Sequence, residues 1–223
     1  MASHLDLEEQ EQLDQLKAFW KSYGNLITSI ITLGLLAFAA WNGWNWWQRD
    51  QAGKAGAMYE ELDRAAQAGD AEKVARVFGD LKDRYARTTY AGQGALLAAK
   101  LQMDKGQAEP ARAALSWAVD NASETEYRDI ARLRLAGLQM DAKQFDEAAK
   151  TLDGIKSAEF AGLVADRRGD LAVQQNKNDV AKEEFLKAYK SLDKTLDYRR
   201  LVEAKLASLG VAAPDTAASG VSQ

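Results

Sequence analysis

The apolar residues of this chain follow two patterns, one continuous and one periodic. From Ser22 to Gln48 the only ionisable side chain is a tyrosine, and the stretch from Leu26 to Trp47 is mainly apolar. As a helix, at about 1.5 Å per residue, it would be roughly 33 Å long, close to the roughly 30 Å of a bilayer's hydrocarbon core. Aromatic residues flank it on both sides, as in an aromatic belt. The first pattern therefore predicts one transmembrane helix over residues 22–48.

Two other interpretations of this stretch are a cleaved signal peptide and a buried core helix. Ala37-Phe38-Ala39 has the small-x-small form of a cleavage site. However, the segment before the stretch is long and acidic, and four tryptophans lie at its end. Aromatic residues at both ends are unusual for a core helix and typical of a membrane span. We therefore expect an uncleaved anchor.

The second pattern is a triplet of small and large apolar residues at positions i, i+4 and i+7. Its four copies begin 37, 37 and 33 residues apart. These offsets put each triplet on one helical face, which must be buried against a neighbouring helix. The copies are Val74-Phe78-Leu81, Ala111-Leu115-Ala118, Ala148-Leu152-Ile155 and Ala181-Phe185-Ala188. Polar breaks precede them at residues 68–70, 104–106, 141–143 and 176–178.

A helix-turn-helix unit of about 34 residues with such turns resembles a degenerate tetratricopeptide array. The sequence thus predicts an all-α protein, with a single N-terminal transmembrane helix followed by a tetratricopeptide-like solenoid of about four helix pairs plus a capping helix. The cap is expected within residues 192–208, with Leu192, Leu196, Leu201, Leu206 and Leu209 as its apolar residues. The expected segments are an acidic cytoplasmic tail (1–21), the anchor (22–48), a short linker (49–57), the repeat domain (58–209) and a disordered tail (210–223).

Composition excludes several function classes. The formal net charge is −4 with no clustered basic face, so we do not expect nucleic acid as a partner. The chain has no cysteine, and its one histidine, His4, lies in the acidic N-terminal segment. Common zinc sites and Ser-His or Cys-His nucleophile pairs are therefore excluded, and no phosphate-binding glycine loop is present. We expect no cofactor, no metal and no enzymatic activity.

In tetratricopeptide arrays the first helix of each pair lines a concave face that receives extended segments of a partner. Met103 and Met140 lie 37 residues apart, and adaptable methionine side chains suit varied apolar segments, although packing between repeats is an open alternative. The positions at which carboxylate-clamp arrays use Asn do not hold it, so we do not expect capture of a C-terminal carboxylate. The candidates for the concave face are Tyr59, Leu96, Lys100, Met103, Leu133, Met140, Asp170 and Gln174.

Asp166 and Asp170 lie one helical turn apart and so share a face. Two carboxylates so placed could serve acid–base chemistry or hold a metal. The neighbouring Arg167 and Arg168 favour simple ion pairs at the surface instead. Gly169 is expected where two helices cross closely.

Several features together resemble the YfgM family, ancillary subunits of the bacterial SecYEG translocon. They are the acidic tail, the anchor with its tryptophan-rich end, the degenerate repeats and the segment GLVADRRGDLAVQQNKND. The resemblance implies a location in the bacterial inner membrane, a cytoplasmic N-terminus, a periplasmic repeat domain and a complex with SecYEG and the isomerase-like chaperone PpiD. It carries no catalytic residues. Charge alone does not fix the orientation, because Lys17 and Lys21 nearly balance Arg49 and Lys54 across the anchor.

These observations favour a non-enzymatic, membrane-anchored interaction protein. It would link SecYEG to periplasmic chaperones such as PpiD and contact emerging, unfolded secretory polypeptides, with the lipid bilayer holding its single helix. The alternative is a scaffold for another cell-envelope complex, for example in cell division.

Overall fold

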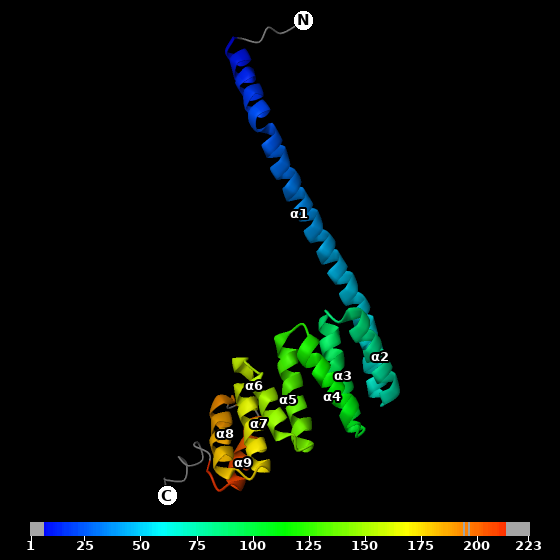
Figure 1. Cartoon of the computed structure of the whole chain (residues 1–223), viewed down its shortest axis with the longest axis vertical. Coiled ribbons are helices and arrows are strands. Elements are labelled where there is room, and N and C mark those ends of the chain that lie inside the picture. Colours follow the sequence, from blue (N-terminus) through cyan, green and yellow to red (C-terminus); the bar gives the residue numbers. More distant parts are fainter. Residues whose placement is uncertain (1–6, 194, 196, 213–223) are drawn as a thin grey trace. The chain divides into compact units, whose positions relative to one another are not determined.

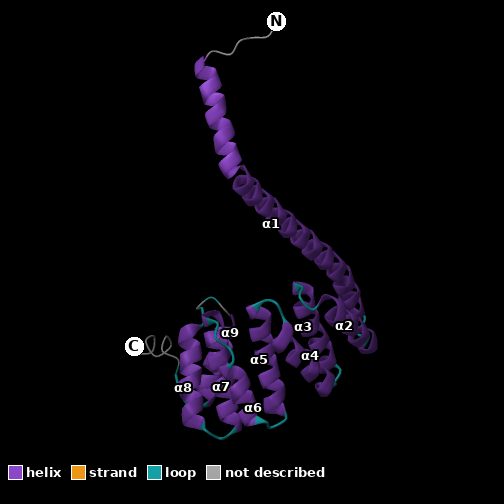
Figure 2. Ribbon diagram, turned by 45° about the horizontal axis from the view of Figure 1, so that its top comes forward, coloured by secondary structure: helices purple, strands orange, loops and turns teal. Residues whose placement is uncertain are grey.

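The computed structural model describes residues 7–193, 195 and 197–212, and every regular element among them is helical (Figure 2). The predicted all-α fold class, with helix pairs and a final helix, is confirmed. The elements are α1 (Leu7–Gln67), α2 (Ala71–Tyr85), α3 (Thr89–Asp104), α4 (Ala108–Asn121), α5 (Thr125–Asp141), α6 (Phe145–Asp153), the 3₁₀ helix η1 (Ala158–Phe160), α7 (Ala161–Gln174), α8 (Asn178–Ser191) and α9 (Asp197–Ser208).

The chain divides into two compact units, residues 1–51 and 52–223. Helix α1, which belongs to the first unit as far as Gln51, is long and apolar enough to cross a membrane, the one such helix among the described residues. Thr28, Ser29 and Thr32 each donate a side-chain hydrogen bond to the backbone carbonyl four residues earlier, at 2.7 to 2.8 Å. Satisfying polar groups inside the helix suits an apolar surrounding. Residues 49–57, the expected linker, are helical and part of α1.

The second unit has the predicted repeat core. All twelve positions of the apolar triplets are buried, and none is more than 9 % exposed. The helix pairs follow one another in chain order (Figure 1). One triplet is closed differently, because α6 ends at Asp153 and Ile155 reaches the core from just beyond the helix. A periodic pattern of small and large residues therefore locates the buried faces even where a helix is short.

Each predicted polar break is a turn with one residue in the left-handed region. The turns share a backbone hydrogen bond of 2.8 to 3.0 Å that closes six residues, the Schellman geometry. The left-handed residues are Gly69, Gly106, Lys143 and Asn176, with φ between 58° and 73°. A fifth such turn, at Gly210 with φ 76°, ends α9. The cap thus ends as the first helix of each pair does.

The capping helix forms within the predicted range but buries a different set of residues. Val202 and Leu206 are fully buried, whereas Leu201, expected among the buried leucines, is 48 % exposed. Leu201 is exposed because α9 presents the neighbouring Val202 to the core, and Leu196, also named for the cap, lies outside the described residues. Val211 packs against the same cluster. Most of the predicted disordered tail, residues 213–223, and the first six residues of the acidic tail lie outside the described residues.

Candidate partner-binding groove

A groove of about 600 Å³ lies in the second unit, lined mainly by α3, α5 and α7, with side chains from α8 and α9. It contains five of the eight residues predicted for the concave face: Lys100, Met103, Met140, Asp170 and Gln174. The structure thus brings these five side chains together. Their role in binding a partner stays a prediction.

The other three predicted residues lie outside this groove. Tyr59 packs against Tyr90, with ring centroids 5.7 Å apart. Leu96 belongs to the buried core, and Leu133 packs against the core cluster of α5, α6 and α7. Leu96 and Leu133 lie 37 residues apart and so occupy equivalent positions of the repeat, both of which face the core.

The repeat period explains the groove's lining. Lys100, Gly137 and Gln174 lie 37 residues apart in α3, α5 and α7, and all three contribute to it. The two methionines differ in exposure: Met103 is 40 % exposed, whereas Met140 is 2 % exposed. Met140 is therefore mainly packed between repeats, which was the open alternative for both methionines. Met103 offers exposed apolar surface in the groove.

Most charged side chains of the groove are paired. Lys100 Nζ lies 3.0 Å from Asp104, and Lys205 Nζ lies 2.7 Å from Asp170. Arg167 is also 3.6 Å from Asp170. Burial raises the pKa of Asp170, although its hydrogen bond with Lys205 acts in the opposite direction. These pairs leave a groove with both signs of charge beside apolar surface.

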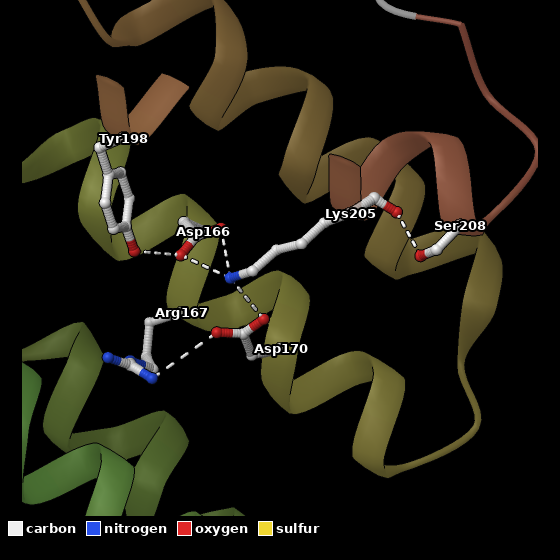
Figure 3. A network of polar contacts seen from close by, with 6 residues as sticks. All are labelled: Asp166, Arg167, Asp170, Tyr198, Lys205 and Ser208. Atoms are coloured by element: carbon white, nitrogen blue, oxygen red, sulfur yellow. Dashed lines mark hydrogen bonds and ion pairs between the residues drawn. The ribbon is translucent and has the colours of Figure 1, made fainter. Parts of the chain in front are cut away.

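Next to the groove, Asp166 is buried and joined to α9 (Figure 3). It is 1 % exposed, and Lys205 Nζ lies 2.8 and 2.9 Å from its two oxygens. Tyr198 donates its hydroxyl to the same carboxylate at 2.6 Å. The partners come from 32 and 39 residues away in sequence, so this network fastens the capping helix to α7.

The expected pairing with the neighbouring arginines is confirmed for Asp170 and was wrong for Asp166. Arg167 pairs with Asp170, and Arg168 pairs with Asp153 at 2.6 Å. Asp166 instead faces inward, because α9 covers it and supplies the compensating charge. The expected close crossing at Gly169 is confirmed, since a Cβ there would lie 2.4 Å from Phe185 Cε1.

Sequence reasoning did not assign the other groove residues to a binding face, namely Asp104, Arg134, Gly137, Asp141, Arg167, Val173, Phe185, Lys205 and Ser208. The 37-residue period could have found Asp141, because Asp104 stands at the equivalent position. No repeat signal points to Lys205, which comes from the cap. Across the described residues no group of three or more His, Cys, Asp or Glu side chains could hold a metal. The groove offers apolar, cationic and anionic side chains that can contact a bound polypeptide.

Comparison with known proteins gives a family and three relatives. Residues 17–211 match the family model described as a tetratricopeptide repeat-like domain. A relative from Neisseria gonorrhoeae is 27 % identical over 210 residues, covering 94 % of this chain and all of the relative. One from Escherichia coli is 28 % identical, covering 91 % and 97 %, and one from Haemophilus influenzae is 29 % identical, covering 83 % and 90 %. All three are named ancillary SecYEG translocon subunit. The chain therefore belongs to this tetratricopeptide repeat-like family, the YfgM family that its sequence resembles.

Proposed function

We propose that this chain is a non-enzymatic interaction protein anchored by α1, an ancillary subunit of the SecYEG translocon. The observation that carries the proposal is the groove of mixed charge and exposed apolar surface, in a chain whose described part has one candidate membrane helix. The names of three relatives that match over nearly their whole length support the partner. Anchoring raises the effective concentration of a weak binding surface, so modest affinity suffices.

In this proposal α1 crosses the bacterial inner membrane with its N-terminus in the cytoplasm, and the repeat unit works in the periplasm. There the groove receives a PpiD-like chaperone and contacts emerging secretory polypeptides. The exposed side chain of Met103 supports the second role, because methionine adapts to apolar segments of different shape.

Purification of the full-length chain from membranes in mild detergent tests the proposal. Gly137→Leu adds a side chain to the groove at a position where nothing lies within 4 Å of the new Cβ. Gly79→Leu is the matched control, because Gly79 also has open space and does not line the groove. We expect wild type and Gly79→Leu to recover SecYEG and the chaperone, and Gly137→Leu to lose the chaperone. Recovery of neither partner by wild type would contradict the proposal.

Photocrosslinking from position 103 separates the translocon role from the envelope scaffold. A photoreactive amino acid replaces Met103, whose exposed side chain tolerates the exchange. The proposal predicts adducts with nascent secretory chains. Adducts with cell-division proteins alone would favour the scaffold.

A further inference from the structure

The helix α5 departs from the repeat at a point where α3 holds an ion pair. In α3, Lys100 pairs with Asp104 one turn later. The equivalent positions in α5, 37 residues on, are Gly137 and Asp141. Asp141 corresponds to Asp104, but glycine stands where the lysine would be. Among the residues that the structure describes, Asp141 forms no salt bridge. The missing side chain also leaves a hollow in the groove, because a Cβ on Gly137 would meet nothing within 4 Å.

A second departure places a cation one turn before the hollow. Arg134 stands where α3 has Leu97. One of its N–H groups donates to the backbone carbonyl of Leu96 at 3.1 Å, and no carboxylate pairs with it within the described ranges. A guanidinium has five donors, so most remain for a ligand. Partial burial lowers the pKa of Arg134 with no neighbouring acid opposing it.

The two unmatched charges have a spacing that suits an extended chain. Arg134 and Asp141 lie seven residues apart on α5, two turns of helix, which separates them by roughly 10 Å along the axis. A segment in the extended polyproline II conformation has three residues per turn and rises about 3.1 Å per residue, so two side chains three residues apart share one side and lie roughly 9 Å apart. Gly137 lies between the two charges, and Met103 of the neighbouring helix adds exposed apolar surface to the same groove.

We propose that the groove binds an extended segment of a partner polypeptide with a defined order of charges. An acidic side chain of the segment pairs with Arg134, a basic side chain three residues away from it pairs with Asp141, and an apolar side chain between them enters the hollow above Gly137. The inference rests on the proposed function, in which the groove binds a partner, and adds the chemistry of the bound segment. Complementary charges of this kind fix register and partner choice.

Selection of random 12-residue peptides displayed on phage, with the full-length chain in lipid nanodiscs as bait, tests this order. We expect enriched peptides to carry an acid and a base three residues apart with an apolar residue between them. The strongest peptide is then synthesised with a twin in which acid and base are exchanged. Since the exchange removes both charge-assisted contacts and sets like charges against each other, the twin should bind at least about tenfold more weakly.

The decisive variant exchanges the groove's own charges, Arg134→Asp with Asp141→Arg. It leaves the net charge unchanged, and we expect it to prefer the twin over the original peptide. The control exchanges Glu60→Arg with Arg64→Glu, an exposed pair 4.0 Å apart that does not line the groove, and should keep the wild-type preference. If the exchange variant loses its helical circular dichroism, Arg134→Gln takes its place and should lose the preference for the acid.

The outcomes separate this inference from the function on which it rests. Peptides without charge order that still fail to bind Gly137→Leu overturn the inference and leave the groove as a binding surface. An exchange variant that keeps the wild-type preference also overturns it. If selection yields no peptide whose binding depends on Gly137, the inference and the proposed use of the groove both fail.

Discussion

At the scale of single residues, the carboxylate of Asp166 depends on donors that reach it from the capping helix. Lys205→Met removes the cation and leaves a buried carboxylate with only the Tyr198 hydroxyl. Breaking a buried pair by removing one partner costs about 3 to 5 kcal/mol. We expect a loss of stability of that size in urea unfolding, with faster hydrogen exchange in α9.

The control is Lys187→Met, which removes an exposed lysine 3.9 Å from Glu184 and should change stability by less than about 0.5 kcal/mol. In the double variant Asp166→Leu/Lys205→Met the cost should fall, because replacing a buried pair by apolar residues is often near neutral. Equal losses in Lys205→Met and Lys187→Met would show that the network does not fasten the cap.

Tyr198 gives the fold a dependence on alkaline pH. Burial, followed by its hydrogen bond to Asp166, raises the pKa of Tyr198 above its ordinary value of 10.0. The folded state therefore holds this proton more tightly than the unfolded chain does. The resulting stabilisation is complete below about pH 10 and is lost as the pH rises from there toward the raised pKa. We expect the free energy of unfolding to decrease above about pH 10.

Tyr198→Phe should flatten this decrease and cost about 1 kcal/mol at neutral pH through the lost hydrogen bond. Unfolding at several alkaline pH values, with tyrosinate absorbance as the titration signal, measures both effects. Burial also raises the pKa of Tyr59, so this tyrosine contributes separately to the decrease of stability at alkaline pH. Tyr59→Phe removes that contribution and is the comparison for Tyr198→Phe. An unchanged alkaline slope in Tyr198→Phe would contradict the assignment.

At the scale of helices, the pairing of α7 with α8 depends on the absence of a side chain at Gly169. A Cβ there would lie 2.4 Å from Phe185 Cε1. Gly169→Ala should therefore force the two helices apart and destabilise the fold by about 1 to 3 kcal/mol, as overpacking does. Thermal unfolding followed by circular dichroism measures the change, and Phe185→Leu in the same chain should restore part of the loss.

Gly137→Ala is the matched control within α5. Nothing lies within 4 Å of its added Cβ, and alanine in a helix interior is more stable than glycine by roughly 0.5 to 1 kcal/mol. The same substitution should thus have opposite signs in the two helices. Stabilisation by Gly169→Ala would refute the close crossing.

The helices themselves were largely predictable, because the period of small and large residues reports which face is buried. The turns were also predictable from polar breaks, although Lys143 and Asn176 adopt a left-handed conformation that glycine holds elsewhere. The candidate site was predictable only in part. A repeat template assigns faces, so it found Lys100 and Met103. It could not assign the partners of Asp166, which come from a cap outside the period.

The positions at which α5 departs from the repeat template can be seen in the sequence, but the sequence alone does not show what these departures do. Arg134 occupies the position of a leucine, and Gly137 that of a lysine. Only the three-dimensional arrangement shows that both line one groove and that no carboxylate among the described residues pairs with Arg134. A repeat template locates the residues that the units share, whereas the choice of a binding partner depends on the residues that differ between units.

At the scale of the whole molecule, few charges bear on the direction in which α1 would cross the membrane. Two lysines precede the apolar stretch, and Arg49 and Lys54 follow it, so the positive-inside rule gives little preference. Long domains are translocated largely regardless of their charge, and the acidic residues of the N-terminal segment contribute little. The direction therefore needs a direct measurement.

The chain has no cysteine, so single cysteine reporters require no prior substitution. Gln12→Cys and Lys156→Cys lie at exposed positions on either side of the apolar stretch. With the repeat unit in the periplasm, a membrane-impermeant maleimide should label Lys156→Cys in intact spheroplasts and Gln12→Cys only after lysis. The reverse pattern would place the groove in the cytoplasm, where it could not meet emerging secretory chains. Labelling of both reporters in intact spheroplasts would mean that α1 does not span the membrane. That result would contradict the proposal of a membrane-anchored interaction protein.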